Sequence, residues 1–186
     1  EEILPVIKEV IMVKPDLRYV IVANESRNES YRDRLYKLME DLGIRDKVTV
    51  RSNVSREELR EIYRNARLYL TLPKNVEGDV EGFGMAIMEA AATGTPAVGG
   101  KGSGADDAIR DGQSGFLVDG SDKEGVVEKI LLIVDNENLR EKLSKGAKRW
   151  ASDNGWESKI KHYIDIYVKI YSKLILPFGV SHQGSD

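Results

Sequence analysis

Cysteine is absent from this 186-residue sequence, and histidine occurs only twice, at His162 and His182. Without cysteine the chain forms neither a disulfide framework nor a thiolate metal site. Neither histidine has neighbouring residues of the kind that share a metal ion, so we expect no metal site. No apolar run reaches the roughly 18 residues that a membrane-spanning helix requires.

A large excess of charge of one sign is also lacking. The 28 Lys and Arg residues nearly balance the 31 Asp and Glu residues, and the formal net charge is −3. This balance gives no reason to expect a nucleic-acid partner, because such partners select basic surfaces. The length and the 41% hydrophobic content suffice for one domain with a proper core. We therefore expect a cytoplasmic globular protein.

Short apolar segments alternate along the chain with segments of helical periodicity. The predicted strands span residues 17–22, 48–50, 67–72, 97–98 and 115–118. The predicted helices span residues 1–13, 31–42, 55–66, 84–93, 105–110, 122–134, 137–151 and 156–175. This alternation predicts an α/β fold, in which a Rossmann-like parallel sheet carries helices on both faces. Ligands of such sheets bind at the carboxyl ends of the strands.

The most informative stretch is Glu81-Gly-Phe-Gly-Met-Ala-Ile-Met-Glu-Ala-Ala-Ala-Thr-Gly-Thr-Pro96. Gly82 and Gly84 free the backbone to approach a ligand closely, and Gly84 is predicted to open a helix. The first N–H groups of a helix have no partner inside it, and together with the helix dipole they attract phosphate or carboxylate. Gly94 is predicted to end the helix with a left-handed cap.

Two carboxylates flank this helix start. Glu89 follows Glu81 by eight positions, a little over two helical turns, so the two side chains are expected to point in broadly similar directions. Carboxylates on either side of a phosphate site accept hydrogen bonds from hydroxyl groups, which favours a nucleotide sugar as the ligand. The alternative is a solvated loop glutamate and a surface helix glutamate, with glycines that serve only a turn.

The spacing of Glu81 and Glu89 resembles the E-x7-E motif of retaining GT-B glycosyltransferases of the group 1 (family 4) type. The segments Ser55–Ala66, Gly94–Val98 and Asp111–Val118 also resemble that family, and the likeness covers roughly residues 1–150. It implies the carboxyl-terminal donor-binding domain of an enzyme of carbohydrate biosynthesis. Such an enzyme transfers a sugar from a nucleotide-diphosphate sugar to an acceptor with retained configuration, and it needs no obligatory cofactor or metal.

The resemblance also implies roles for individual residues. Glu81 is the implied catalytic residue and contacts the donor sugar, while Glu89 binds the ribose hydroxyls. The other implied donor-binding residues are Arg51, Ser52, Asn53, Val54, Gly82, Phe83, Gly84, Met85, Gly104 and Asp107. The loop 51–54 borders the base, the backbone of 82–85 cradles the sugar and diphosphate, and Gly104 lies in a loop against the sugar. Asp107 replaces the family's usual glutamate, which shortens the acid.

The family pattern begins one strand earlier, with an Arg and a Lys that hold the donor diphosphate. This sequence opens in what resembles the following helix. We therefore expect residues 1–155 to form a donor-binding domain without its first, central strand, and residues 156–186 to form a terminal helix and tail. The implied partner is an amino-terminal acceptor-binding domain, and the chain alone is expected to be incomplete and inactive. A non-catalytic nucleotide-sugar-binding module, or one subunit of a split enzyme, remains the alternative, and a homo-oligomer stays open.

Two further patterns carry competing hypotheses. Gly100-Lys-Gly102-Ser-Gly-Ala105 fits G-x-G-x-x-A and precedes Asp119, which is typical of a dinucleotide-binding Rossmann domain, although the helix that follows is short. Residues 160–175 mix tyrosines with lysines. A basic aromatic helix of this kind can lie on the inner face of a membrane, and the alternative is a packing helix with lysine stems along its flank.

Overall fold

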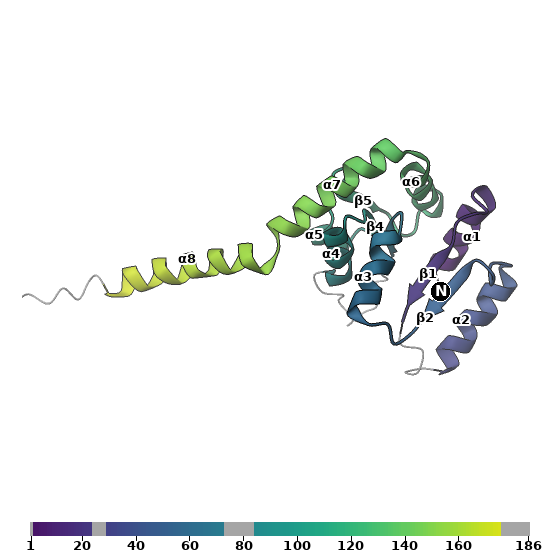
Figure 1. The fold of residues 1–186 in the computed structure, drawn as a ribbon, viewed down its shortest axis with the longest axis horizontal. Helices are drawn as coiled ribbons and strands as arrows, with labels where there is room; N and C mark the ends of the chain where they lie inside the picture. The colour runs from purple at the N-terminus through teal and green to yellow at the C-terminus, as the bar shows by residue number, and fades with distance from the viewer. Residues whose placement is uncertain (1, 24–28, 73–83, 176–186) are drawn as a thin grey trace, which may run out of the picture. The chain divides into compact units, whose positions relative to one another are not determined.

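A computed structural model describes residues 2–23, 29–72 and 84–175 of the chain (Figure 1). The chain forms two compact units, Glu1–Ala151 and Ser152–Asp186. In chain order the elements are α1 (Ile3–Val13), β1 (Tyr19–Val22), α2 (Glu29–Asp41), β2 (Val48–Arg51), α3 (Arg56–Asn65), β3 (Tyr69–Thr71), α4 (Met85–Thr93), β4 (Ala97–Gly100), α5 (Ala105–Ala108), β5 (Gly115–Val118), α6 (Lys123–Asp135), α7 (Glu137–Asp153) and α8 (Trp156–Ile175).

The predicted α/β fold and the predicted order of helices and strands are confirmed. Two loop predictions are corrected, since Arg51 ends β2 and the strand β4 continues through Gly100. Glycine is a weak strand former by itself. Both glycines nevertheless belong to the strand, because Gly99 pairs with Leu117 of β5 and Gly100 pairs with Val118.

The described strands form two parallel sheets rather than one (Figure 1). In the first, β1 pairs with β2 from Tyr19↔Val48 onward. In the second, β4 lies between β3 and β5. No ladder joins β1 to β3 within the part of the chain that the structure describes. Each of these two strands therefore has an edge without a strand partner.

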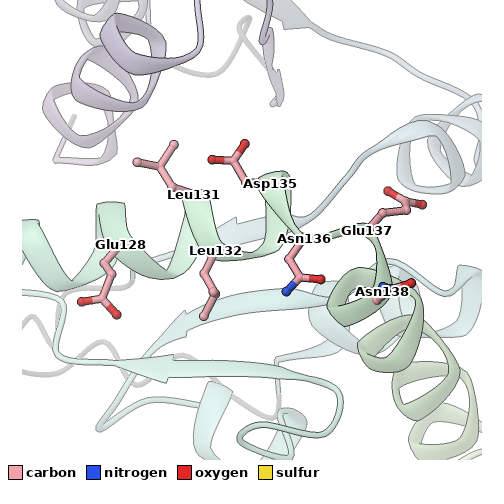
Figure 2. A pocket seen from close by; sticks show the side chains of 7 residues that line it. All are labelled: Glu128, Leu131, Leu132, Asp135, Asn136, Glu137 and Asn138. Carbon is pink, nitrogen blue, oxygen red and sulfur yellow. The ribbon is translucent and has the colours of Figure 1, made fainter.

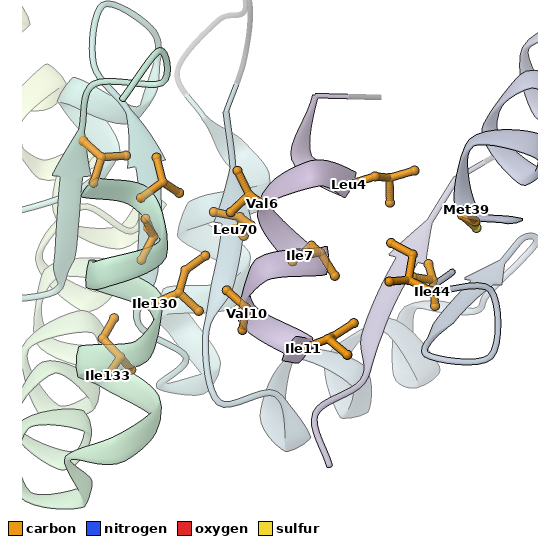
Figure 3. Packing of buried hydrophobic residues seen from close by; sticks show 14 of the residues in the cluster. Leu4, Val6, Ile7, Val10, Ile11, Met39, Ile44, Leu70, Ile130 and Ile133 are labelled. Atoms are coloured by element: carbon orange, nitrogen blue, oxygen red, sulfur yellow. The ribbon is translucent and has the colours of Figure 1, made fainter. Parts of the chain in front are cut away.

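Two hydrophobic clusters cover the two faces of the β3–β4–β5 sheet. Because side chains alternate along a strand, Val98 joins the larger cluster with Ile130 and Ile133 of α6, whereas Ala97 joins a smaller cluster with Ile87 of α4. The larger cluster continues through α1 to α2 and β2 (Figure 3). Helices α1 and α6 pack on each other, and α3 packs on α4, so helices cover both faces.

Local sequence signals set the helix ends near the predicted site. Ser55 and Glu58 form the expected capping box of α3, in which the Ser55 N–H donates to Glu58 Oε2 at 2.8 Å and the Glu58 N–H donates to Ser55 Oγ at 3.2 Å. Helix α4 starts after Gly84 and ends at Gly94, whose φ of 89° gives the predicted left-handed cap. These caps fix the start of α3 and the end of α4.

Helix α8 belongs to the second unit and is exposed along its described side chains, with Trp156 at 83% and Tyr167 at 72% exposure. Its apolar residues include Ile160, Tyr163 and Ile164. Within the described ranges no helix is both long enough and apolar enough to cross a membrane.

Candidate functional site

A pocket of about 570 Å³ lies where α6 ends and α7 begins (Figure 2). Two of its carboxylates are already paired, because Asp135 contacts Lys14 at 2.6 Å and Glu137 contacts Arg67 at 3.6 Å. A hydrogen bond from Arg140 also lowers the pKa of Glu137. None of the predicted site residues that the structure describes lines this pocket. We therefore place the candidate site elsewhere, at the carboxyl ends of the strands.

The start of α4 is built around Gly84. This residue has φ 63° and ψ 44°, a left-handed conformation that glycine adopts readily. A Cβ added there would lie 3.0 Å from the Gly104 carbonyl oxygen and 3.1 Å from the Ala108 Cβ. Among the described residues no side chain caps the helix, and the first N–H that bonds back to the Gly84 carbonyl is that of Ile87, so the N–H groups of Met85 and Ala86 precede the helical hydrogen bonds. Met85, the next residue, is 69% exposed.

Gly84 and Gly104, two of the predicted site residues, are therefore brought together by the fold. The loop that carries Gly104 is shaped by its own side chains. Ser103 Oγ donates to the Gly100 carbonyl at 2.8 Å and accepts from the Ala105 N–H at 3.1 Å. The Gly102 N–H donates to Asp106 Oδ2 at 2.8 Å. These bonds give the loop beside the start of α4 a defined shape without a ligand.

Helix α7 supports the same loop through the short helix α5 that follows it. Trp150 donates its indole N–H to the Ala108 carbonyl oxygen at 3.0 Å. The Arg110 guanidinium lies 4.0 Å from the centre of the Trp150 ring, close enough for a cation–π interaction. Both contacts fix the end of α5. The predicted residue Asp107 lies on this short helix and is exposed.

Glu89 is exposed on α4, and it lies close enough to the Tyr63 hydroxyl of α3 to raise the pKa of Tyr63. The Tyr63 ring is buried and meets the Tyr69 ring edge to face, with 5.8 Å between the ring centres. The backbone carbonyl of Tyr63 accepts a hydrogen bond from Thr95 Oγ1 at 2.6 Å. Burial raises the pKa of Tyr63, and Tyr69 and Glu89 raise it further. The hydroxyl therefore stays protonated and able to donate to Glu89.

Tyr63 is not marked by any of the site motifs. The only signal in the sequence is one large aromatic residue near the end of a helix that is otherwise mostly charged. Such a residue is ordinarily read as a packing contact. Its hydroxyl gains a second role only because α3 and α4 pack side by side.

The loop after β2 is shaped by the start of α3. Arg51 pairs with Glu58 at 3.2 Å, the same glutamate that closes the capping box. The backbone hydrogen bond from Ser55 is the main cause that lowers the pKa of Glu58, and Arg51 adds to it. Asn53 has φ 55°, the left-handed region that asparagine tolerates. Ser52 and Val54 are half-buried.

Arg51 and Ala86, the second residue of α4, line one cavity of about 1300 Å³. The fold thus brings the predicted base loop and the start of α4 to the same cavity. The predicted residues Glu81, Gly82 and Phe83 lie outside the described residues. Within the described residues, no group of three or more His, Cys, Asp or Glu side chains could hold a metal ion.

The dinucleotide hypothesis is not supported by the geometry of its motif. Helix α5 has only four residues, and Asp106 already occupies the Gly102 N–H that a phosphate would use. Asp119 accepts hydrogen bonds from the N–H and hydroxyl of Ser121, at 2.9 and 2.6 Å, which lower its pKa. Its carboxylate serves a local turn rather than a ribose.

Comparison with known proteins gives a consistent result. The family model described as "Glycosyl transferases group 1" matches residues 2–150. D-inositol 3-phosphate glycosyltransferase of Thermomonospora curvata is 34% identical over 133 residues, which cover 72% of this chain and 30% of that protein. The chain therefore spans about a third of the length of the curated relatives it matches.

Solved structures show the same fold. Anabaena HepE, in complex with UDP-glucose, has a TM-score of 0.75 at 18% identity, over 90% of this chain and 44% of that one. The C-terminal domain of LpcC, a group 1 family protein of Francisella tularensis, has a TM-score of 0.67 at 17% identity, over 82% of this chain and 77% of that one. At these identities the likeness establishes the fold alone.

Proposed function

Because this chain belongs to the group 1 glycosyl transferases over residues 2–150, we propose that it is the donor-binding domain of a retaining enzyme of the family 4 type. The domain binds a nucleoside diphosphate sugar at the carboxyl ends of its strands. The observation that carries this proposal is the meeting of Gly84 and Gly104, which places an uncapped helix start beside a preformed loop.

The backbone of residues 82–85 and the start of α4 receive the diphosphate. Their N–H groups donate to phosphate oxygens, and the helix dipole favours the negative charge. Charge on the diphosphate rises as its bond to the sugar breaks. A fixed donor array therefore stabilises the leaving group more in the transition state than in the ground state. The absence of a Cβ at Gly84 lets the loop that carries Gly104 lie close to the start of α4.

The nucleoside lies towards α3. Glu89 accepts hydrogen bonds from the ribose hydroxyls, and the neighbouring Tyr63 hydroxyl, whose pKa Glu89 raises, can donate to the same carboxylate and orient it. The loop Arg51–Val54 borders the base. The ion pair between Arg51 and Glu58 and the left-handed Asn53 give that loop a defined shape before binding.

The sugar lies at the other end of the diphosphate. Glu81 contacts it and is the catalytic residue, while Gly104 and Asp107 contribute contacts from the α5 side. The reaction breaks the bond between the anomeric carbon and a diphosphate oxygen and forms a bond to an acceptor hydroxyl oxygen. The nucleoside diphosphate and the hydroxyl proton are released, and the configuration is retained without a metal or other cofactor. An amino-terminal domain of the whole protein binds the acceptor.

Calorimetry of the 186-residue chain with UDP, GDP and ADP tests the binding step. UDP is the first choice, since the structurally similar HepE binds UDP-glucose. We expect one diphosphate to bind with a Kd of about 10 µM to 1 mM, and its nucleoside at least about tenfold more weakly. A folded chain that binds none of the three at about 1 mM contradicts the proposal. With the full-length protein, the anomeric configuration of the product, read by NMR, decides between retention and inversion.

A further inference from the structure

The end of α5 depends on a hydrogen bond from a distant part of the chain. Trp150 of α7 donates its indole N–H to the Ala108 carbonyl oxygen at 3.0 Å, across 42 positions of sequence. Ala108 is the last residue of α5, a helix of only four residues. The last carbonyls of a helix have no partner inside it, and Ala108 is buried, with 1% of its surface exposed. The indole N–H therefore satisfies a buried acceptor that α5 cannot satisfy itself.

Ala108 also connects Trp150 to the candidate site. Its N–H donates to the Gly104 carbonyl oxygen at 3.2 Å. The same oxygen would lie 3.0 Å from a Cβ added at Gly84, and the Ala108 Cβ would lie 3.1 Å from it. Direct contacts therefore run from Trp150 through Ala108 to the loop at Gly104 and to the start of α4. A displacement of α5 changes the position of Gly104 relative to Gly84.

Helix α7 is itself fixed along the face that carries Trp150. A Cβ added at Gly146 would meet the Gln113 carbonyl oxygen, so the helix lies directly against the turn after α5. Gly146 and Trp150 are four positions apart and share one face of α7. Leu143 and Ala147 are completely buried and anchor the helix in the core. The indole N–H is therefore presented to α5 from a fixed support.

Resting on the proposed function, we infer that Trp150 is a positioning residue for the donor sugar. It acts through Ala108 and holds α5 so that Gly104 and Asp107 face the sugar end of the donor. The Arg110 guanidinium, 4.0 Å from the centre of the Trp150 ring, packs on the indole and keeps it in place. Without the indole N–H, α5 opens more often and the loop spends less time in the binding position. The diphosphate depends less on Trp150, because the start of α4 receives it.

The unsubstituted chain provides the first test. The sequence has two tryptophans, and Trp156 is 83% exposed, so its indole N–H is an internal reference. Hydrogen exchange of both indole N–H groups is followed by NMR. We expect the Trp150 group to exchange at least about tenfold more slowly than the Trp156 group. Equal exchange of the two groups overturns the inference.

The second test uses Trp150→Phe, which keeps an aromatic ring beside Arg110 and removes the N–H. The matched control is Ile133→Val, because Ile133 lies in the larger hydrophobic cluster, whereas Ala108 lies in the smaller one. The control is expected to lower the melting temperature by about 1–5 °C.

Amide exchange at Ala108 is compared in each chain with exchange at Val98, which is buried in β4. We expect this ratio to rise at least about fivefold in Trp150→Phe and to stay unchanged in Ile133→Val. An unchanged ratio in a folded Trp150→Phe chain overturns the inference.

Calorimetry with UDP and UDP-glucose separates a positioning role from a merely structural one. We expect Trp150→Phe to raise the Kd for UDP-glucose about 3- to 10-fold and the Kd for UDP by less than about twofold. Ile133→Val should change neither Kd by more than about twofold. Equal weakening of both ligands, or no weakening of either, overturns the inference.

The two kinds of failure remain distinguishable. Hydrogen exchange is measured without nucleotide, so it decides whether Trp150 holds α5 even where no nucleotide binds. An unsubstituted chain that binds neither UDP nor UDP-glucose contradicts the proposed function, and with it the role of Trp150 towards the sugar. A chain that binds both ligands and loses them equally in Trp150→Phe contradicts the positioning role alone.

Discussion

At the scale of single residues, the candidate site depends on two features of α4 and its neighbours. Gly84 permits a backbone conformation and a close approach that no larger residue fits. Tyr63 brings a protonated hydroxyl close to Glu89. Each feature can be tested by a substitution whose effects on binding and on stability differ.

Replacing Glu89 by Ala is expected to raise the Kd for UDP roughly 10- to 100-fold, because hydrogen bonds from hydroxyls to a charged carboxylate are lost. The melting temperature should stay nearly unchanged, since Glu89 is exposed. Calorimetry and a thermal melt measure the two effects, with Glu141→Ala on the exposed side of α7 as a control. A variant with unchanged affinity would make Glu89 a surface residue only.

Tyr63→Phe keeps the buried ring and its contact with Tyr69 while removing the hydroxyl. We expect UDP binding to weaken by about 2- to 10-fold, because the carboxylate of Glu89 loses the neighbouring hydroxyl that can orient it. In the Glu89→Ala background the same change should have no further effect, because the partner is gone. Additive losses in the double variant would show that Tyr63 acts independently of Glu89.

Gly84→Ala is expected to destabilise the fold by about 1–3 kcal/mol, from left-handed strain and from contact with Gly104 and Ala108. Gly112→Ala is the matched control, since Gly112 has φ 69° and nothing within 4 Å of an added Cβ. It carries the strain without the crowding. Urea unfolding of both variants separates the contribution of left-handed strain from that of crowding. An equal loss of stability in both variants would show that crowding contributes nothing.

At the scale of elements, α3 positions both the base loop and Tyr63, and its start is fixed by the capping box. Glu58 serves the cap and also pairs with Arg51, which ends β2. A change at the start of α3 should therefore affect local stability and the shape of the loop together. The hydrogen bond from Trp150 to the Ala108 carbonyl similarly fixes the end of α5.

The capping box predicts a pH dependence. The pKa of Glu58 is lowered from its ordinary 4.5 in the folded chain. A lowered carboxyl pKa contributes stability that is fully present above about pH 4.5 and is lost as the pH falls through the lowered value. Glu58→Gln should therefore lose less stability than the parent chain between pH 7 and pH 3, in urea titrations with CD detection. An identical loss of stability between pH 7 and pH 3 in the parent chain and in the variant would contradict this role of Glu58.

At the scale of the whole molecule, the chain presents unsatisfied surfaces. Within the described residues, β1 and β3 each have one edge that pairs with no strand. Helix α8 carries an apolar stripe at helical spacing, whose members are Ile160, Tyr163, Ile164, Tyr167 and Tyr171, each more than half exposed. Exposed apolar surface of this kind promotes association.

We therefore expect the 186-residue chain to self-associate through α8 at high concentration, as measured by light scattering. The combined variant Ile164→Lys and Tyr167→Lys should shift it to a monomer without changing the melting temperature of the first unit. Replacing Lys161 and Lys169 by Gln on the same helix, which leaves the stripe intact, is the control. A parent chain that is monomeric at high concentration would show that the stripe is not an association surface.

The sequence by itself determined what depends on neighbouring residues. The order of strands and helices, the capping box of α3 and the glycine ends of α4 were all predictable, because periodicity, caps and left-handed glycines are local properties. The resemblance carried by the motifs around Glu89, Gly94 and Asp111 also identified the family that the comparison with known proteins establishes. The role of Glu81 stays a prediction, since it lies outside the described residues.

Only the tertiary structure decided which distant residues meet. The approach of Gly84 to Gly104, and the position of the Tyr63 hydroxyl near Glu89, depend on how α3, α4 and α5 pack. The occupation of the Gly102 N–H by Asp106, which removes the dinucleotide interpretation, depends on a turn that the motif alone does not define. The division of the described strands into two sheets likewise follows from packing, because the sequence of a strand sets its period but not which of its edges finds a partner.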